Sequence, residues 1–171
     1  MLKSYHMSRT ISICWRSRGF RPFSKFVIRE TLTTNGFKVG SSAEMTHIFT
    51  QDEVKLFADL GGDNNPLHID PQFAKSTIFE GPIVHGILVG SLFSTLMGRS
   101  INGSIYVSQS LQFKAPVHVG AEVIAKLVVS FVEQKRLGVL LSCTTTCTLV
   151  ASGKTAIVGE AKVLVPKVPA Y

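Results

Sequence analysis

The sequence predicts an α+β fold in a single domain, with a long buried helix wrapped by a curled antiparallel sheet. Two observations carry this prediction. Residues 80–98, "EGPIVHGILVGSLFSTLMG", are apolar almost all round, as expected of a helix that is buried on most sides. After residue 103, alternating and β-branched runs are separated by turn signals, which is typical of strands. A sheet of about five strands could bury such a helix against one face.

Charge divides the chain into a leader and a domain. The formal net charge is +7, yet residues 1–29 contain seven Lys or Arg and no Asp or Glu. The other 11 basic residues are balanced by 11 acidic residues. A leader that is rich in Arg and Ser and free of acids is typical of a mitochondrial presequence; a basic tail that binds anions is the alternative. We therefore expect residues 1–30 to be disordered or removed, and residues 37–168 to form the domain.

The same numbers argue against two classes of partner. Once the leader is set aside, the domain has no excess of positive charge to attract nucleic acid. The longest apolar run is too short to cross a bilayer and contains a histidine, so no membrane insertion is expected.

The first half of the domain is predicted to combine a strand with helices. Residues 37–50 end in an alternating pattern that favours a strand. Thr50 and Glu53 have the spacing of a capping box, which predicts a helix that Gly61-Gly62 ends. Pro71 can begin a short helix before the long apolar one.

The second half is predicted to be an antiparallel meander. Cys143 and Cys147 fall four apart in one of its strands, so they point to one face and are expected to be reduced packing residues. A helix wrapped in such a sheet is the hot-dog arrangement, and its open edges are expected to pair with a second copy. The four strands are expected within residues 104–117, 121–134, 139–151 and 154–165.

Candidate chemistry lies in the loop "FADLGGDNNPLHID", residues 57–70. Asn65-Pro66 predicts an extended corner, and a turn between Asp63 and His68 could bring both side chains to one point. A carboxylate beside an imidazole can handle water or a carbon-bound proton at neutral pH. The residue types alone also fit a loop of turn and cap residues, or a metal site formed by Asp63, His68 and Asp70.

A second candidate element is the start of the apolar helix, at "VHGIL". A helix N-terminus offers unpaired N–H groups, and Gly86 can leave its amide open to a substrate oxygen, as an oxyanion hole requires. Close packing explains the same glycine equally well. Ser94 lies about two turns further on, so it points roughly the same way, although a serine bonded only to its own helix fits this position too.

These segments resemble a known family. "FADLGGDNNPLHIDPQFA", "FEGPIVHGILVGSLFSTLMG" and "GSIYVSQSLQFKAPVHVGAEV" resemble, in this order, the MaoC-like (R)-specific enoyl hydratases, or hydratase 2. The likeness covers residues 37–165. With the basic leader, the chain looks most like the mitochondrial 3-hydroxyacyl-thioester dehydratases (type 2) of this family.

The resemblance implies a hot-dog homodimer that reversibly adds or removes water between trans-2-enoyl and (3R)-hydroxyacyl thioesters. It implies Asp63 and His68 as the catalytic pair, Gly86 N–H as donor to the thioester carbonyl, Ser94 as a further active-site group, and Asn65 as a residue that orients the loop. The carrier would be acyl carrier protein or coenzyme A, with mitochondrial fatty acid synthesis in the matrix favouring the former. No metal or other cofactor is expected.

Two other functions fit the same fold. A hot-dog thioesterase would be favoured by a water-activating Asp or Glu on the central helix, but the sequence has none between Ile83 and Met97. A non-catalytic acyl-binding subunit is opposed by the intact pair of Asp63 and His68.

Overall fold

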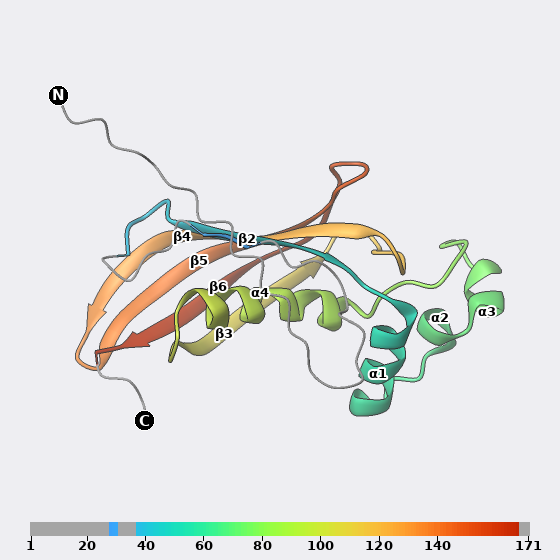
Figure 1. Ribbon diagram of the computed structural model, residues 1–171, viewed down its shortest axis with the longest axis horizontal. Helices are drawn as coiled ribbons and strands as arrows, with labels where there is room; N and C mark the ends of the chain where they lie inside the picture. The colour runs from blue at the N-terminus through green and yellow to red at the C-terminus, as the bar shows by residue number, and fades with distance from the viewer. Residues whose placement is uncertain (1–27, 31–36, 168–171) are drawn as a thin grey trace.

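The computed structural model describes residues 28–30 and 37–167, and the rest of the predicted leader lies outside the described residues. A six-stranded antiparallel sheet curves over one long helix, α4, with three shorter helices beyond one end of the sheet (Figure 1). The helices are α1 (Gln51–Gly61), α2 (Pro66–Ile69), α3 (Pro71–Lys75) and α4 (Gly86–Ser100). The strands are β1 (Ile28–Glu30), β2 (Ser42–Ile48), β3 (Ile105–Phe113), β4 (Glu122–Lys135), β5 (Gly138–Leu149) and β6 (Thr155–Pro166).

The core lies between α4 and the face of the sheet that it covers. α4 contacts β2, β3, β4 and β5. Alternate residues of these strands point to the helix, because side chains in a strand alternate between the two faces. The hot-dog arrangement expected from the sequence is confirmed. The core includes Val89, Leu92, Phe93, Leu96 and Met97 of α4, Ala43 and Met45 of β2, Val123, Ala125 and Leu127 of β4, and Leu141, Cys143 and Cys147 of β5.

The predicted meander is wrong in one pairing. The sheet order is β1-β2-β4-β5-β6-β3, so only β4, β5 and β6 form a meander, and β3 pairs with β6 at the far edge. Residues 114–121 are too long for a tight hairpin. They run beside the segment before α4 instead, where Val84 N–H donates to Val117 O and Val119 N–H donates to Pro82 O. These bonds hold residues 114–121 along the path from β3 to β4, which lie at different places in the sheet.

α4 is less enclosed than its composition predicts. Its inner face is buried, but Ile87, Ser91, Ser94 and Gly98 are exposed in the single chain. They follow one another at helical spacing and form one face. No described helix has the length and hydropathy needed to cross a membrane.

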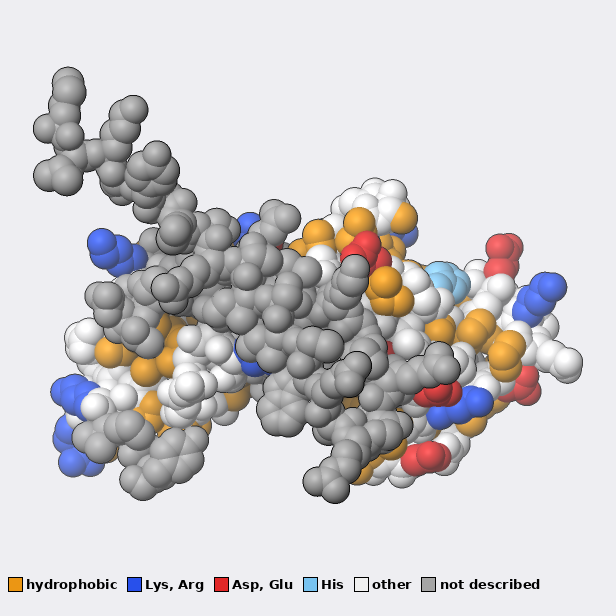
Figure 2. All heavy atoms as spheres, in the orientation of Figure 1, with side chains coloured by type: hydrophobic (Ala, Val, Ile, Leu, Met, Phe, Trp, Pro, Cys, Tyr) orange, Lys and Arg blue, Asp and Glu red, His pale blue; other side chains and the backbone are white. Residues whose placement is uncertain are grey.

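Most of the acidic side chains visible in Figure 2 lie toward the end of the molecule formed by α1–α3. The helix α1 begins with the predicted capping box. Thr50 Oγ1 accepts from Glu53 N–H at 3.2 Å, and Thr50 N–H donates to Glu53 Oε2 at 2.7 Å. Glu53 Oε1 also lies 3.1 Å from Nε2 of the buried His47, which ties the start of α1 to the end of β2.

Candidate active site

Asp63 lies just after the end of α1. Gly62 ends this helix with a left-handed backbone, φ 75°, and its N–H donates to Ala58 O. Glycine adopts this conformation without the steric cost that a Cβ would bring. The chain therefore turns sharply and presents the Asp63 carboxylate, which is 57% exposed. Asn65 N–H donates to Asp63 Oδ1 at 3.3 Å.

His68 lies in α2, a short helix that the sequence analysis did not predict. The expected corner is present at Asn65, whose backbone is extended with φ −55° and ψ 124°. Pro66 then takes the first position of the helix, where a missing N–H costs nothing, and Asn65 Oδ1 caps it by accepting from Leu67 N–H. The helical turn shortens the path from Asp63 to His68. Gln51 Nε2 donates to His68 O at 3.0 Å and holds α2 against α1.

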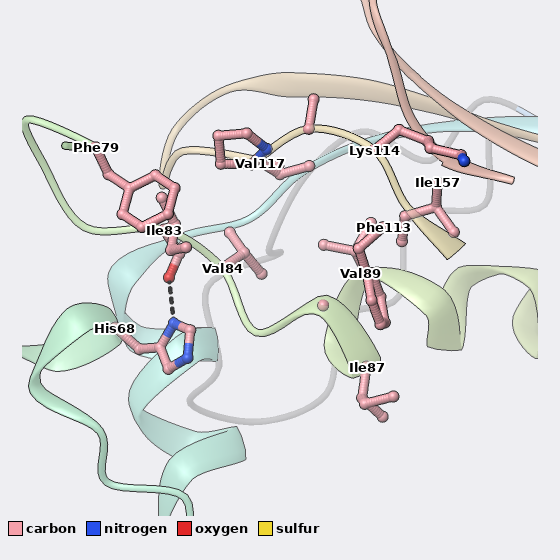
Figure 3. Close-up of a pocket in the computed structure, with 13 residues that line it drawn as sticks. His68, Phe79, Ile83, Val84, Ile87, Val89, Phe113, Lys114, Val117 and Ile157 are labelled. Atoms are coloured by element: carbon pink, nitrogen blue, oxygen red, sulfur yellow. Dashed lines mark hydrogen bonds between the residues drawn. The ribbon is translucent and has the colours of Figure 1, made fainter. Parts of the chain in front are cut away.

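The ring of His68 has a defined orientation (Figure 3). Its Nδ1 lies 2.8 Å from the carbonyl oxygen of Ile83. A carbonyl only accepts hydrogen bonds, so Nδ1 carries a proton and Nε2 of the neutral ring keeps a lone pair. That lone pair gives the site a base.

A third side chain, His85, completes the cluster. Its Nε2 lies 3.0 Å from Asp63 O and 3.8 Å from Asp63 Oδ2. Its ring centroid is 3.8 Å from that of His68, with 32° between the ring planes. One ring or carboxylate atom from each of Asp63, His68 and His85 lies within 4.8 Å of the others. The structure thus brings together the two residues expected from the sequence, with a histidine that was not among the predicted site residues.

The signal for His85 was present in the sequence. It is a polar residue inside an otherwise apolar run, "PIVHGILVG", directly before Gly86. A histidine that is only 3% exposed in such a run must meet polar partners to offset its desolvation. Which partners it meets depends on the packing of α4 against a loop 22 residues earlier, and no local pattern contains that information.

The metal site considered from the sequence, formed by Asp63, His68 and Asp70, is not present, because Asp70 serves as a helix cap. Asp70 Oδ1 accepts from Gln72 N–H at 2.9 Å and Phe73 N–H at 3.1 Å, and so caps α3. Asp63, His68 and His85 could together offer three ligand atoms to a metal ion. His85 Nε2 already lies 3.0 Å from Asp63 O, so an ion bound there would have to replace that hydrogen bond.

A cavity of about 420 Å³ opens beside His68. Figure 3 shows His68 at one side of it, with Val84, Val89, Phe113 and Ile157 toward α4 and the sheet. Its lining is largely apolar, and Lys114 is the one Lys or Arg among the lining residues. Such a cavity fits an aliphatic chain with a reacting group near His68.

Gly86 lies in the wall of this cavity, at the first position of α4. A Cβ on Gly86 would lie 2.6 Å from the Phe113 ring, so any side chain at this position would force that ring to shift. The first amides of a helix have no acceptor within the helix, so the Gly86 N–H is a donor at the cavity wall. Ser94 is exposed on α4 and is not among the lining residues, so the single chain does not bring it to the cavity.

Comparison with known proteins places this geometry in a family. The family described as "MaoC like domain" matches residues 29–151. The chain is 45% identical over 138 residues to the (R)-specific enoyl-CoA hydratase of Aeromonas caviae, covering 79% of this chain and 100% of that protein. It is 33% identical over 129 residues to the mitochondrial 3-hydroxyacyl-[acyl-carrier-protein] dehydratase of Arabidopsis thaliana, covering 75% of this chain and 78% of that protein.

The fold agrees with these similarities. The solved structure of the (R)-hydratase from A. caviae involved in PHA biosynthesis superposes with a TM-score of 0.72 at 44% identity, covering 78% of this chain and 100% of that one. R-hydratase PhaJ1 from Pseudomonas aeruginosa gives a TM-score of 0.70 at 33% identity, covering 77% of this chain and 84% of that one. The activities named for these relatives are hydro-lyase activities. On sequence, fold and extent of match, the chain belongs to the MaoC-like domain family.

Proposed function

We propose that this chain is a (3R)-3-hydroxyacyl-thioester dehydratase, which reversibly removes water to give the trans-2-enoyl thioester. The observation that carries the proposal is the convergence of Asp63 and His68 beside an apolar cavity whose wall includes the N-terminus of α4. The activities named for the relatives in Aeromonas caviae and Arabidopsis thaliana support the same class of reaction.

In the dehydration direction, His68 Nε2 takes the proton from C2 of the substrate. The electron pair of the broken C–H bond forms an enolate, and the Gly86 N–H donates to the thioester oxygen on which this charge develops. A donor of this kind is worth roughly 3–4 kcal/mol in the transition state. The C3–O bond then breaks, and the proton on His68 Nε2 passes to the departing oxygen to give water.

Asp63 has a different part in this scheme. Its exposed carboxylate accepts a hydrogen bond from the C3 hydroxyl or from the water that forms, and so orients the oxygen toward His68. Its negative charge also stabilises the transient imidazolium. Proton removal and proton return by one imidazole occur on one face of the substrate, which gives syn elimination. Asn65 supports this geometry by capping α2.

The carrier, location and assembly are further parts of the proposal. We propose acyl carrier protein as the carrier and the mitochondrial matrix as the location, supported by the basic leader and by the names of the relatives in Arabidopsis thaliana and Solanum lycopersicum. We also propose a homodimer joined at the outer edge of β3, which pairs only with β6 among the described strands. Ser94 and the rest of the exposed face of α4 lie where a second copy can cover them.

The test is hydration of enoyl thioesters on both carriers, followed by the loss of enoyl absorbance and by product chirality. Asp63→Asn and His68→Ala are expected to lose activity by roughly 10²–10⁴-fold while they fold normally. Asp59→Asn and His118→Ala are the matched controls, since neither residue lies in the cluster or among the lining residues of the cavity. Turnover near that of the wild type in either Asp63→Asn or His68→Ala would refute the assignment.

A further inference from the structure

We propose that His85 is a positioning residue, which fixes the backbone at Asp63 and the ring of His68 relative to each other. The inference rests on the proposed function, because it gives His85 a role toward the pair proposed to act on the substrate. It concerns a residue of the helix start that neither binds the substrate nor transfers its proton.

His85 occupies the N-cap position of α4 without capping the helix. Its side chain makes no hydrogen bond to the first turn of α4. It reaches back to Asp63 instead, with Nε2 at 3.0 Å from the carbonyl oxygen. That oxygen only accepts, so Nε2 carries the proton and Nδ1 of the neutral ring carries the lone pair.

This hydrogen bond anchors a loop that has few other restraints. Before Asp63 stand Gly61 and Gly62, which resist rotation of the backbone less than other residues do. The Asp63 carboxylate itself is held only by the long bond of 3.3 Å from Asn65 N–H among the hydrogen bonds of the described residues. The bond from His85 joins this loop to α4, which is the helix at the centre of the core.

The second contact of His85 is with the proposed base. Its ring stacks on His68 with centroids 3.8 Å apart, and Phe57 packs against it at 5.0 Å. His68 is therefore held by its bond to Ile83 O at Nδ1 and by the face of the His85 ring.

A packing role alone explains His85 poorly. Its Nδ1 is buried and has no hydrogen-bond partner in the part of the chain that the structure describes. An unpaired buried acceptor is costly, and an apolar ring of similar shape would avoid the cost. The imidazole instead provides a donor at Nε2 that phenylalanine lacks, and this donor is the one directed at Asp63.

Two substitutions separate the donor from the ring. His85→Phe keeps an aromatic ring against His68 but removes the donor. His85→Gln loses the ring but can place its amide Nε2 near the position of the imidazole Nε2 and donate to Asp63 O. We expect His85→Phe to lower kcat for hydration about 10- to 100-fold with little change in KM, because misplacement of reacting groups acts on the chemical step. We expect His85→Gln to recover most of that loss.

His47→Phe is the matched control. His47 is another buried histidine, paired with Glu53 and packed on Phe49, and it lies outside the cluster. This variant is expected to lower Tm without lowering kcat. Equal losses of kcat in His85→Phe and His85→Gln would overturn the inference, as would turnover of His85→Phe within about twofold of the wild type.

The outcomes distinguish this inference from the proposed function. If Asp63→Asn and His68→Ala remain active, the proposed function fails whatever the His85 variants do. If both are inactive and His85→Phe is fully active, only the role of His85 fails. Nitrogen NMR of the wild-type protein gives a readout without any variant: the proton of the His85 ring is expected on Nε2, and a proton on Nδ1 alone would contradict the inference.

Discussion

Gln51 connects the first turn of α1 to the proposed base, since its Nε2 donates to His68 O. A net hydrogen bond of this kind is worth about 1 kcal/mol. We expect Gln51→Ala to lower kcat by about fivefold, because α2 can then shift and carry His68 away from Asp63. Steady-state kinetics on an enoyl thioester measure the change, with Lys55→Ala, exposed on the same helix, as the control. A fall in Tm with unchanged kcat would limit Gln51 to holding α2 in place.

The site could be predicted from sequence only where the signal is local. Asp63 and His68 are five residues apart in a segment full of turn formers, so their convergence followed from spacing and turn chemistry. His85 joins them through the packing of α4, and its contact with Asp63 spans 22 residues. The cap made by Asp70 is also local, but residue type alone left a metal site with Asp63 and His68 open as an alternative for its carboxylate.

At the scale of elements, the two glycines that end α1 should respond in opposite ways to replacement by alanine. Gly61 is the last residue of the helix, with open space where a Cβ would lie, whereas Gly62 has a positive φ of 75°. Alanine at position 61 should stabilise the fold by up to about 1 kcal/mol, because it restricts the unfolded chain and favours the helix. Alanine at position 62 should destabilise it by about 1 kcal/mol, because its Cβ strains the left-handed conformation. Urea unfolding of both variants tests the prediction, and shifts of the same sign would contradict it.

The stability contributed by the contact between Glu53 of α1 and His47 of β2 should depend on pH. Burial raises the pKa of the Glu53 carboxyl, but hydrogen bonds from His47 and Thr50 outweigh burial and hold this pKa below its ordinary value of 4.5. A carboxyl with a depressed pKa stabilises the folded state above its unfolded pKa, and that stability is lost as pH falls through the folded pKa. We therefore expect Glu53→Gln to have a lower free energy of unfolding than the wild type at neutral pH. The gap between the two free energies of unfolding should shrink as the pH falls below 4.5.

Urea unfolding at a series of pH values measures this effect. Glu133→Gln is the control, since Glu133 is exposed and pairs only with the exposed Lys135 among the described residues. Exposed pairs contribute little to stability, so this variant should follow the wild type at every pH. A constant difference between wild type and Glu53→Gln across the acid range would show that Glu53 acts only as a cap.

At the scale of the whole molecule, the strands and the buried helix could be predicted from the sequence, but the order of the strands in the sheet could not. Alternation and β-branched runs mark β3 to β6 as strands, and the buried helix marks the face that they cover. Which strands pair is decided by residues 114–121, whose backbone bonds to residues 82–84 carry the chain across the sheet. Such contacts join segments more than thirty residues apart, and no periodic pattern in the sequence reveals them. The exposed face of α4 was missed because the apolar composition of this segment does not show which of its residues the sheet leaves uncovered.

The outer edge of β3 is where we expect two copies of the chain to pair. Among the described strands β3 pairs only with β6, so backbone groups on its outer side lack a strand partner, and Ile105, Val107 and Phe113 are each about half exposed. An exposed apolar edge promotes pairing with another chain, and two copies of β3 placed antiparallel would close both edges and cover the exposed side of α4.

We expect the protein to be a dimer by light scattering. We expect Val107→Lys to be a folded monomer, because a charged edge residue opposes strand pairing. Val39→Lys, exposed but outside the β strands, is the control and should stay dimeric. A dimeric Val107→Lys would place the interface elsewhere, and a monomeric wild type would remove the homodimer from the proposal.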